Sequence, residues 1–266
     1  MNGIRNITKK NLINFELGFH AEYTTKKEIL EGIADLAEKY KAPVYTHNSE
    51  SESEVAQCIE RTKVTPTVYM DRLGIFNYGG GFYHCVHMTQ NDLDIVKEHN
   101  ISVITNPASN LKLASGIAPI DHMLKEGINL AIGTDGPASN NCLDMFREMF
   151  LVTALAKYRE NDASAVDALE VLKMATIGGA KAMNLTDCDV LAEGKEADII
   201  MIDLNQPNMQ PIHNIKKNLV YSGSKQNVKL TMVAGKILYE NGEFFIGTDA
   251  YKIYEKANDI AERIVK

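Results

Sequence analysis

Short apolar runs alternate with longer amphipathic stretches over the first half of the chain, from about Leu12 to Asp135. The apolar runs predict strands over residues 12–19, 43–47, 82–86, 101–105 and 128–133. The stretches between them carry apolar residues at helical spacing and predict helices, among them residues 52–61, residues 91–98 and a short helix that ends at Gly127. Such alternation is typical of βα units around a parallel sheet, so the pattern predicts five parallel strands here.

The helix expected directly after the first strand has a predicted start signal. Thr25 is followed three residues later by Glu28, which is the spacing of a capping box. The helix that would begin there places its apolar residues on one face, namely Ile29, Ile33, Leu36, Ala37 and Tyr40.

The pattern changes after Asp135. Residues 143–159 and 164–183 predict two helical segments, and strand signals follow at residues 197–204, 219–222, 228–233 and 236–239. Asn241 and Gly242 tolerate positive φ and predict a tight hairpin turn. The tail is therefore expected to form a small antiparallel β-unit, followed by a helix over about residues 249–265.

Composition and charge narrow the classes of partner and compartment. The 266 residues are 45% hydrophobic and carry a formal net charge of −7, with no basic block that would follow a phosphate backbone, so a nucleic acid polymer is not expected as a partner. Four cysteines without paired spacing suit reduced thiols and a cytoplasmic protein. No apolar run has the length of a signal peptide core or a membrane span, so no membrane partner is expected.

Candidate chemistry lies where the predicted strands end. His20 follows the first strand, His47 and Glu50 follow the second, His84 lies near the third, and Asp135 follows the last. In closed (β/α) barrels the carboxyl ends of the strands carry the active site, because that rim brings side chains from several strands to one centre. Imidazole and carboxylate groups at such a rim suit metal-assisted hydrolysis.

Other histidines and acids have a simpler interpretation. His84 and His87 are three apart on an extended segment and point to opposite faces, so His84 is expected inside and His87 at the periphery. Glu52 and Glu54 are expected as acids of a helix's first turn, where the helix dipole favours them. The remaining histidines on helices or in the tail are expected to be structural, namely His99, His122 and His213.

Four segments together resemble a known family. They read YTHNSES, YHCVHMTQNDLD, NPASNLKLASGIAPI and GTDGPASNNCLDMFREM, and they are similar to successive barrel-strand signatures of the amidohydrolase superfamily, in its methylthioadenosine/S-adenosylhomocysteine deaminase branch. The tail segments GKEADIIMIDL and VKLTMVAGKILYENGEF resemble the returning strands of that family's β-sandwich. The resemblance covers the chain from Asn14 onward.

The resemblance implies a fold and its domains. The fold would be α/β, with a partial (β/α)8 TIM-type barrel formed by about the last five strands and a small carboxy-terminal β-sandwich portion. The implied domains are a partial barrel over residues 1–190, a sandwich portion over residues 191–248 and a terminal helix over residues 249–266.

The resemblance also implies roles for the strand-end residues. His47 and Asp135 would bind the metal, and Asp135 would take a proton from the attacking water. Glu50 would carry a proton to the ring nitrogen, and His84 would polarise the water and steady the tetrahedral centre. His20 would line the substrate pocket together with Glu50, His84 and Asp135, so that Glu50, His84 and Asp135 have both catalytic and substrate-binding roles.

The implied reaction is hydrolytic deamination of an adenosine-like nucleoside: S-adenosylhomocysteine, methylthioadenosine or adenosine. The implied cofactor is one divalent metal, zinc in the first place, with iron or nickel as alternatives. Two-metal relatives use a carbamylated lysine at the fourth barrel strand, and the corresponding segment, residues 15–20, holds no lysine, which favours a single-metal site. Hydantoinase-like chemistry is therefore the less favoured enzyme class.

One departure from the family pattern limits these implications. Full members have a His-x-His pair at the first barrel strand that supplies two metal ligands, and the chain has no such pair. We therefore expect the 266 residues by themselves to hold metal weakly and to be inactive, either as a truncated product, which we favour, or with the missing amino-terminal piece supplied by another chain. A homo-oligomer is a further possibility for covering the open barrel edge.

Two alternative functions remain open from the sequence. The first is hydrolysis of another heterocycle, such as guanine, cytosine or a triazine, because related deaminases share parts of the same motifs. The second is a catalytically dead remnant that acts as a binding subunit.

Overall fold

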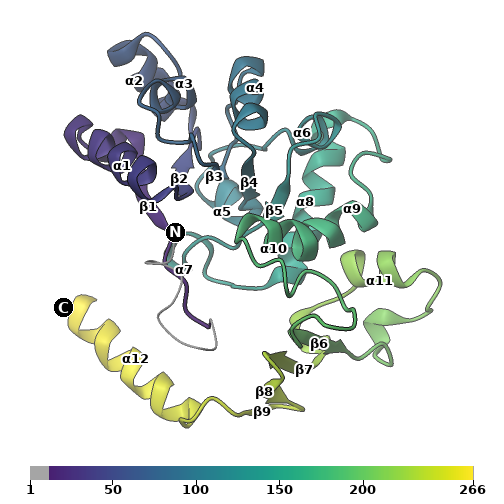
Figure 1. Ribbon diagram of the computed structural model, residues 1–266. Helices are drawn as coiled ribbons and strands as arrows, with labels where there is room; N and C mark the ends of the chain where they lie inside the picture. The colour runs from purple at the N-terminus through teal and green to yellow at the C-terminus, as the bar shows by residue number, and fades with distance from the viewer. Residues whose placement is uncertain (1–11, 266) are drawn as a thin grey trace. The chain divides into compact units, whose positions relative to one another are not determined.

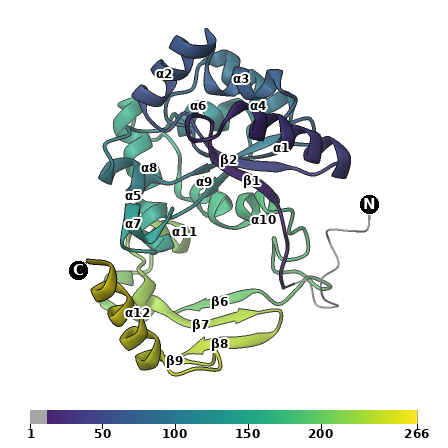
Figure 2. The same ribbon diagram turned by 90° about the vertical axis from the view of Figure 1, so that its left-hand side faces the viewer.

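The computed structural model describes residues 12–265, which form two compact units that divide between Leu185 and Thr186 (Figures 1 and 2). The predicted domain limits at residues 1 and 266 lie outside the described residues. Within residues 12–265, the structure contains no helix whose length and apolar content would allow it to cross a membrane.

The first unit is built on a parallel five-stranded sheet with the strand order β1-β2-β3-β4-β5. Each strand follows its predecessor in sequence and lies beside it in space, as Figure 1 shows. The predicted parallel sheet of βα units is confirmed. The strands are β1 (Leu17–Ala21), β2 (Val44–Asn48), β3 (Gly80–His84), β4 (Ile101–Thr105) and β5 (Leu130–Ile132).

Helices connect and cover these strands. They are α1 (Lys27–Tyr40), α2 (Glu52–Thr62), α3 (Pro66–Arg72), α4 (Gln90–Glu98), α5 (Pro107–Lys112), α6 (Ile120–Lys125), α7 (Pro137–Asn140), α8 (Met145–Glu160), α9 (Ala168–Lys173) and α10 (Gly179–Ala182). A 3₁₀ turn, η1 (Glu22–Thr24), precedes α1, and a π-helical turn, η2 (Met174–Gly178), joins α9 to α10. The helix α3 was not predicted, although Thr65 as N-cap and Pro66 at the first position are common helix start signals.

The predicted start of the first helix is wrong. Lys26 is the N-cap of α1 and makes no side-chain capping bond, whereas the Thr25 hydroxyl donates to the Ala21 carbonyl at 2.8 Å. The hydroxyl is used to close the turn after β1 and is unavailable to the helix. The strand itself begins at Leu17 and not at Leu12, and the preceding Leu12, Ile13 and Phe15 are 62%, 67% and 56% exposed.

Two glycines permit close approaches that the sheet requires. Gly80 begins β3 with a φ of +142°, and a Cβ there would lie 1.8 Å from the Val44 carbonyl oxygen of β2. Gly178, in the π-turn, would place a Cβ 2.0 Å from the Leu130 carbonyl oxygen of β5. A side chain at either position would therefore force the backbone apart.

The core of the first unit includes a pair of aromatic side chains that pack against each other. Phe82 of β3 is fully buried and meets the buried Phe76 ring edge to face, with centroids 4.7 Å apart. We expect Phe82→Ala to lower the free energy of unfolding by about 3–5 kcal/mol, because it removes buried surface and leaves a cavity. Urea unfolding measures this change. The control Tyr158→Ala, at a side chain 80% exposed, should stay within about 0.5 kcal/mol of wild type, and an equal loss in both variants would contradict the expectation.

The second unit contains an antiparallel sheet with the order β6-β7-β8-β9, which is clearest in Figure 2. Its strands are β6 (Ile199–Ile202), β7 (Val228–Val233), β8 (Lys236–Glu240) and β9 (Glu243–Phe244). The 3₁₀ turns η3 (Pro207–Met209) and η4 (Lys225–Asn227) and the helices α11 (Ile215–Tyr221) and α12 (Ala250–Val265) complete it. The predicted antiparallel tail is therefore confirmed.

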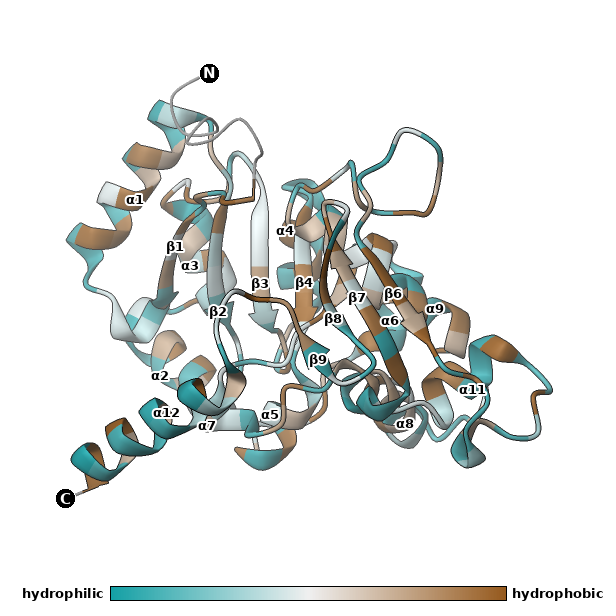
Figure 3. Ribbon diagram, turned by 90° about the horizontal axis from the view of Figure 1, so that it is seen from below, coloured by the Kyte–Doolittle hydropathy of each residue, from teal (hydrophilic) through white to brown (hydrophobic). Residues whose placement is uncertain are grey.

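Two predictions for this unit, a turn and a strand, have different outcomes. Asn241 and Gly242 have φ values of 48° and 97° and form the two-residue turn between β8 and β9, as predicted. The strand predicted at residues 219–222 is wrong, because residues 215–221 form α11. The Asn214 side chain accepts from the Lys217 amide and caps this helix, a local signal that outweighs the short apolar run. Figure 3 shows the apolar and polar residues alternating along α12, whose residues 251–265 are exposed.

Candidate active site

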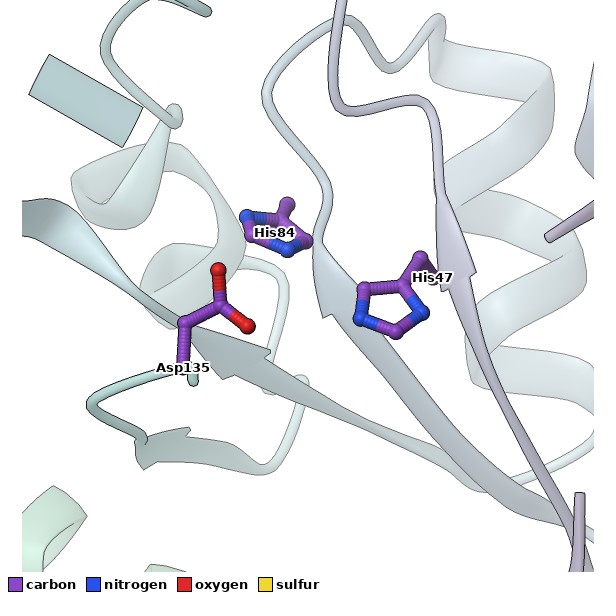
Figure 4. A group of neighbouring side chains, drawn as sticks. All are labelled: His47, His84 and Asp135. Atoms are coloured by element: carbon purple, nitrogen blue, oxygen red, sulfur yellow. The ribbon is translucent and has the colours of Figure 1, made fainter. Parts of the chain in front are cut away.

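Three predicted site residues meet at the carboxyl ends of the parallel strands. His47 lies in β2, His84 ends β3, and Asp135 follows β5. One potential ligand atom from each lies within 4.8 Å of the others, and Figure 4 shows the three side chains turned toward a common space. The imidazole rings of His47 and His84 are stacked with centroids 5.4 Å apart. The strand order therefore brings together residues that are up to 88 positions apart in the chain.

The backbone is unusual at these strand ends. Ser49, His84 and Asp135 have φ values of 51°, 72° and 58°, in the left-handed region that non-glycine residues seldom adopt. Such conformations carry an energetic cost and persist where the surrounding structure holds them. Two of these residues, His84 and Asp135, belong to the cluster shown in Figure 4.

Hydrogen bonds to the two histidines fix their tautomers. The Nδ1 atom of His47 lies 2.6 Å from the His20 carbonyl oxygen, and Nδ1 of His84 lies 2.7 Å from Oδ1 of Asn110. Both partner oxygens only accept, so each Nδ1 carries a proton, and in the neutral imidazole each Nε2 then offers a lone pair. Proteins commonly orient a metal-binding imidazole in this way, through a hydrogen bond donated by the ring nitrogen that does not bind the metal.

The free nitrogen of His84 is buried. His84 is 1% exposed, and its Nε2 atom has no hydrogen-bond partner among residues 12–265. Two carboxylates lie nearby: Oε2 of Glu50 at 3.8 Å from Nε2, and an oxygen of Asp135 within 4.8 Å of a ring nitrogen. A buried acceptor without a partner is costly in a protein interior, and it points to a group that the site is built to receive.

Asp135 is held by two hydroxyls. Ser109 and Ser139 donate to the same oxygen, Oδ2, at 2.6 Å and 2.5 Å. Burial alone would raise the pKa of Asp135, but the hydrogen bonds from Ser109, Ser139 and the Gly136 backbone outweigh it and lower the pKa below its ordinary value. The group is therefore held as a carboxylate, the form that binds cations.

Glu50 projects from the turn after β2, and a neighbouring acid fixes that turn. The buried carboxylate of Glu54 accepts from the backbone amides of Ser49 and Glu50 at 2.9 Å and 2.8 Å, and Ser51 and Glu54 form a capping box at the start of α2. Burial raises the pKa of Glu54 despite these hydrogen bonds. The expectation that Glu54 belongs to the first helical turn is confirmed, since its side chain serves the turn and not the site.

His20 lies beside His47 on the exposed side of the cluster. The two rings are 4.8 Å apart, and Nδ1 of His20 hydrogen-bonds with the Thr24 hydroxyl at 2.9 Å. The structure therefore brings His20 next to the three-residue cluster. The other histidines bond elsewhere: His99 to Asp71 at 2.8 Å and His122 to Gln90 at 3.0 Å.

Sequence reasoning missed two residues that contact the site. Ser139 holds Asp135, and Ser115 donates to Oε1 of Glu50 at 3.0 Å. Ser139 had a local signal, because it follows Asp135 by four residues within the quoted motif GTDGPASNN. Ser115 lies within the quoted segment NPASNLKLASGIAPI, but its contact with Glu50 spans 65 positions of sequence and had no local signal.

The donors fit a divalent metal. Two imidazole nitrogens with free lone pairs and one anionic carboxylate oxygen are ligand types that zinc accepts, and catalytic zinc sites use three protein ligands and leave a further position for water. The orphaned Nε2 of His84 supports this fit. The sequence named His47 and Asp135 as ligands, and the structure places a ring nitrogen of His84 within 4.8 Å of their donor atoms.

The comparisons with known proteins identify the family. A sequence model of the amidohydrolase family matches residues 2–238. The chain belongs to the amidohydrolase family. The resemblance inferred from the strand-end motifs is therefore confirmed.

Two relatives of this amidohydrolase are named as deaminases. The 5-methylthioadenosine/S-adenosylhomocysteine deaminase of Caldanaerobacter subterraneus subsp. tengcongensis is 40% identical over 255 residues, which are 96% of this chain and 59% of the relative. The 5′-deoxyadenosine deaminase of Methanopyrus kandleri is 36% identical over 255 residues, with the same 96% and 59% coverage. The chain thus spans about three fifths of these relatives' length, and the sequence places it in the predicted branch of the superfamily.

A solved structure agrees with the fold. An adenosine deaminase from Xanthomonas campestris, crystallised with bound zinc, superposes with a TM-score of 0.90 at 35% identity, covering 95% of this chain and 58% of that one. The amidohydrolase described here is therefore an α/β protein close in fold to that zinc-containing deaminase.

Proposed function

We propose that this amidohydrolase serves in the hydrolytic deamination of an adenosine-like nucleoside, with S-adenosylhomocysteine, methylthioadenosine and adenosine as the substrate candidates. The observation that carries the proposal is the convergence of His47, His84 and Asp135, with Glu50 beside them, at the carboxyl ends of the parallel strands. The names of the relatives support the nucleoside class.

In this proposal His47 and Asp135 hold one divalent ion, for which zinc is the first choice. When bound, such an ion lowers the pKa of water from far above neutrality to about 7 and so supplies a nucleophile at neutral pH. The residues around it bind, orient and move protons. Their chemistry follows from their hydrogen bonds.

Each residue has a proton role that its environment supports. Asp135 is ionised, and in this proposal its carboxylate accepts a proton from the attacking water. The free Nε2 lone pair of His84 accepts a hydrogen bond from that water and orients it. Glu50, whose carboxylate is 3.8 Å from His84 Nε2, carries the proton to the purine ring nitrogen. A carbon–oxygen bond forms at the carbon that bears the amine, the carbon–nitrogen bond breaks, and ammonia and the inosyl product leave.

His20 has a substrate-facing role in the same proposal. Its exposed ring lies 4.8 Å from the His47 ring and therefore borders the space above the cluster. We assign it to the wall of the substrate pocket, together with Glu50, His84 and Asp135.

We also propose that the five-stranded sheet forms part of an eight-stranded (β/α)8 barrel, as its last five strands, and that β6 to β9 form part of a β-sandwich. Two features support this. Among the described residues β1 pairs only with β2, so that one of its edges is open, and the fold agrees with a longer amidohydrolase structure.

The substrate test uses the polypeptide at its full natural length, loaded with zinc. We expect release of ammonia from S-adenosylhomocysteine, methylthioadenosine or adenosine, together with the absorbance change from adenine to hypoxanthine. Guanine, cytosine and a triazine serve as comparison substrates. Deamination of one of these and of none of the nucleosides would refute the nucleoside assignment, whereas absence of any hydrolysis would refute the proposed enzyme activity.

A further inference from the structure

Glu50 has a partner far away in the sequence. The Ser115 hydroxyl donates to Oε1 of Glu50 at 3.0 Å, while the other carboxylate oxygen, Oε2, is the one 3.8 Å from Nε2 of His84. The serine therefore occupies one oxygen and leaves the second directed toward the site. A hydrogen bond to a charged acceptor is stronger than one between neutral groups, which suits it to restrain a flexible side chain.

Ser115 is itself firmly held. It is 8% exposed, its amide donates to the Asn110 carbonyl at 2.8 Å, and its own carbonyl accepts from Nε2 of His87 at 2.7 Å. The next residue, Gly116, has a φ of +124°, and a Cβ there would lie 2.9 Å from Cγ1 of Val86. The loop after α5 is thus packed closely against the segment that follows β3.

The contacts close a ring of three segments. The backbone amide of His87 donates to the Ser49 carbonyl at 3.0 Å, next to Glu50 in the chain. The His87 ring then holds Ser115, and the Ser115 hydroxyl returns to Glu50. His87, expected at the periphery, therefore links the turn that carries Glu50 to the loop that restrains it.

The same loop also serves His84. Oδ1 of Asn110 accepts from Nδ1 of His84, and the Asn110 carbonyl accepts from the Ser115 amide. One short segment, residues 110–115, consequently orients the imidazole through one residue and the carboxylate through another.

We propose that Ser115 is a positioning residue that orients Glu50 for proton transfer, and that His87 acts with it by fixing the Ser115 backbone. The inference rests on the proposed function in that Glu50 is the proton carrier there. A glutamate side chain has three rotatable bonds, and displacement of a reacting group by about 1 Å can cost about 10²-fold in rate. The serine contributes by selecting one orientation and does not contact the substrate.

The kinetic test compares Ser115→Ala, Ser115→Thr and the remote control Ser164→Ala in the full-length zinc-loaded protein. We expect Ser115→Ala to lower kcat by about 10- to 100-fold with KM and zinc content near wild type. Ser115→Thr should restore most of the rate, because it keeps the hydroxyl. A purely structural role would give the reverse order, since the larger threonine is harder to fit at a buried position, and that order would overturn the proposal.

A double variant tests whether the serine acts through Glu50. In Glu50→Gln the proton carrier is already lost, so adding Ser115→Ala should lower kcat by less than about 2-fold more. A further loss as large as that in the single variant would show an independent role and would overturn the proposal. His87→Gln, which keeps a donor, should lose less activity than His87→Ala.

A readout independent of activity separates this inference from the proposed function. Crystal structures of wild type and Ser115→Ala should show Glu50 in one orientation in the first and rotated or in several conformers in the second. If wild type hydrolyses a different heterocycle, the proposed substrate is wrong and the same variants are compared on that heterocycle. If Glu50 keeps one unchanged orientation without the Ser115 hydroxyl, the positioning role is wrong whatever the reaction.

Discussion

Changing Asp135 to Asn should abolish deamination in the full-length protein, with a loss of at least ~10⁴-fold, and should also reduce the zinc retained after dialysis. Two properties of the carboxylate account for this. One of its oxygens lies within 4.8 Å of the other donors of the cluster, and hydrogen bonds from Ser109 and Ser139 keep the group ionised. The amide is neutral, so it is a weaker ligand and accepts no proton from water. Ammonia release and elemental analysis measure the two effects.

Asp94→Asn provides the matched control for this loss, because Asp94 is an exposed acid of α4 with a hydrogen bond to Gln90. It should keep both the activity and the zinc content of wild type. Full zinc occupancy in Asp135→Asn, combined with lost activity, would remove Asp135 from the ligand set and leave it a proton acceptor alone.

Changing Glu50 to Gln should lower kcat by about 10²- to 10⁴-fold and leave the zinc content unchanged. Glutamine preserves the size of the side chain and can still accept from the Ser115 hydroxyl, but it cannot carry the proton. The carboxylate lies near Nε2 of His84 at 3.8 Å, and it is not one of the three residues whose donor atoms cluster. Its loss should therefore affect the rate and not the metal.

The control Glu52→Gln removes an exposed acid only two positions away, in the first turn of α2. We expect wild-type rates from it. Near-full activity of Glu50→Gln, or loss of its zinc to the extent seen in Asp135→Asn, would show that the proton-carrier assignment is wrong. The two substitutions thus distinguish binding of the metal from transfer of the proton.

Much of the fold follows from local patterns in the sequence. The alternation of apolar runs and amphipathic stretches predicted the parallel strands, and β4 and β7 have the predicted limits, Ile101–Thr105 and Val228–Val233. Strand and helix periods differ because successive side chains alternate across a strand but recur every 3.6 residues on a helix. The turn at Asn241 and Gly242 was predictable for a similar reason, since both residues tolerate positive φ.

Predictions from local patterns were wrong where a polar side chain could hydrogen-bond to either of two backbone partners. Thr25 was predicted to cap a helix, yet its hydroxyl donates to the Ala21 carbonyl. Residues 219–222 were predicted as a strand, yet Asn214 caps the helix α11 that includes most of them. In both cases the competing states are close in energy, and the neighbouring chain decides between them.

Some features of the candidate site likewise follow from the sequence, and others depend on the tertiary structure. The sequence by itself determined which strand ends carry His47, Glu50, His84 and Asp135, because parallel βα units place all those ends on one edge of the sheet. Only the tertiary structure decided the state of each group: the proton on Nδ1 of both histidines, the free Nε2 of His84, and the hydroxyls on Asp135 and Glu50. Those properties come from contacts between segments at the ends of different strands, and such contacts leave no periodic signal along the chain.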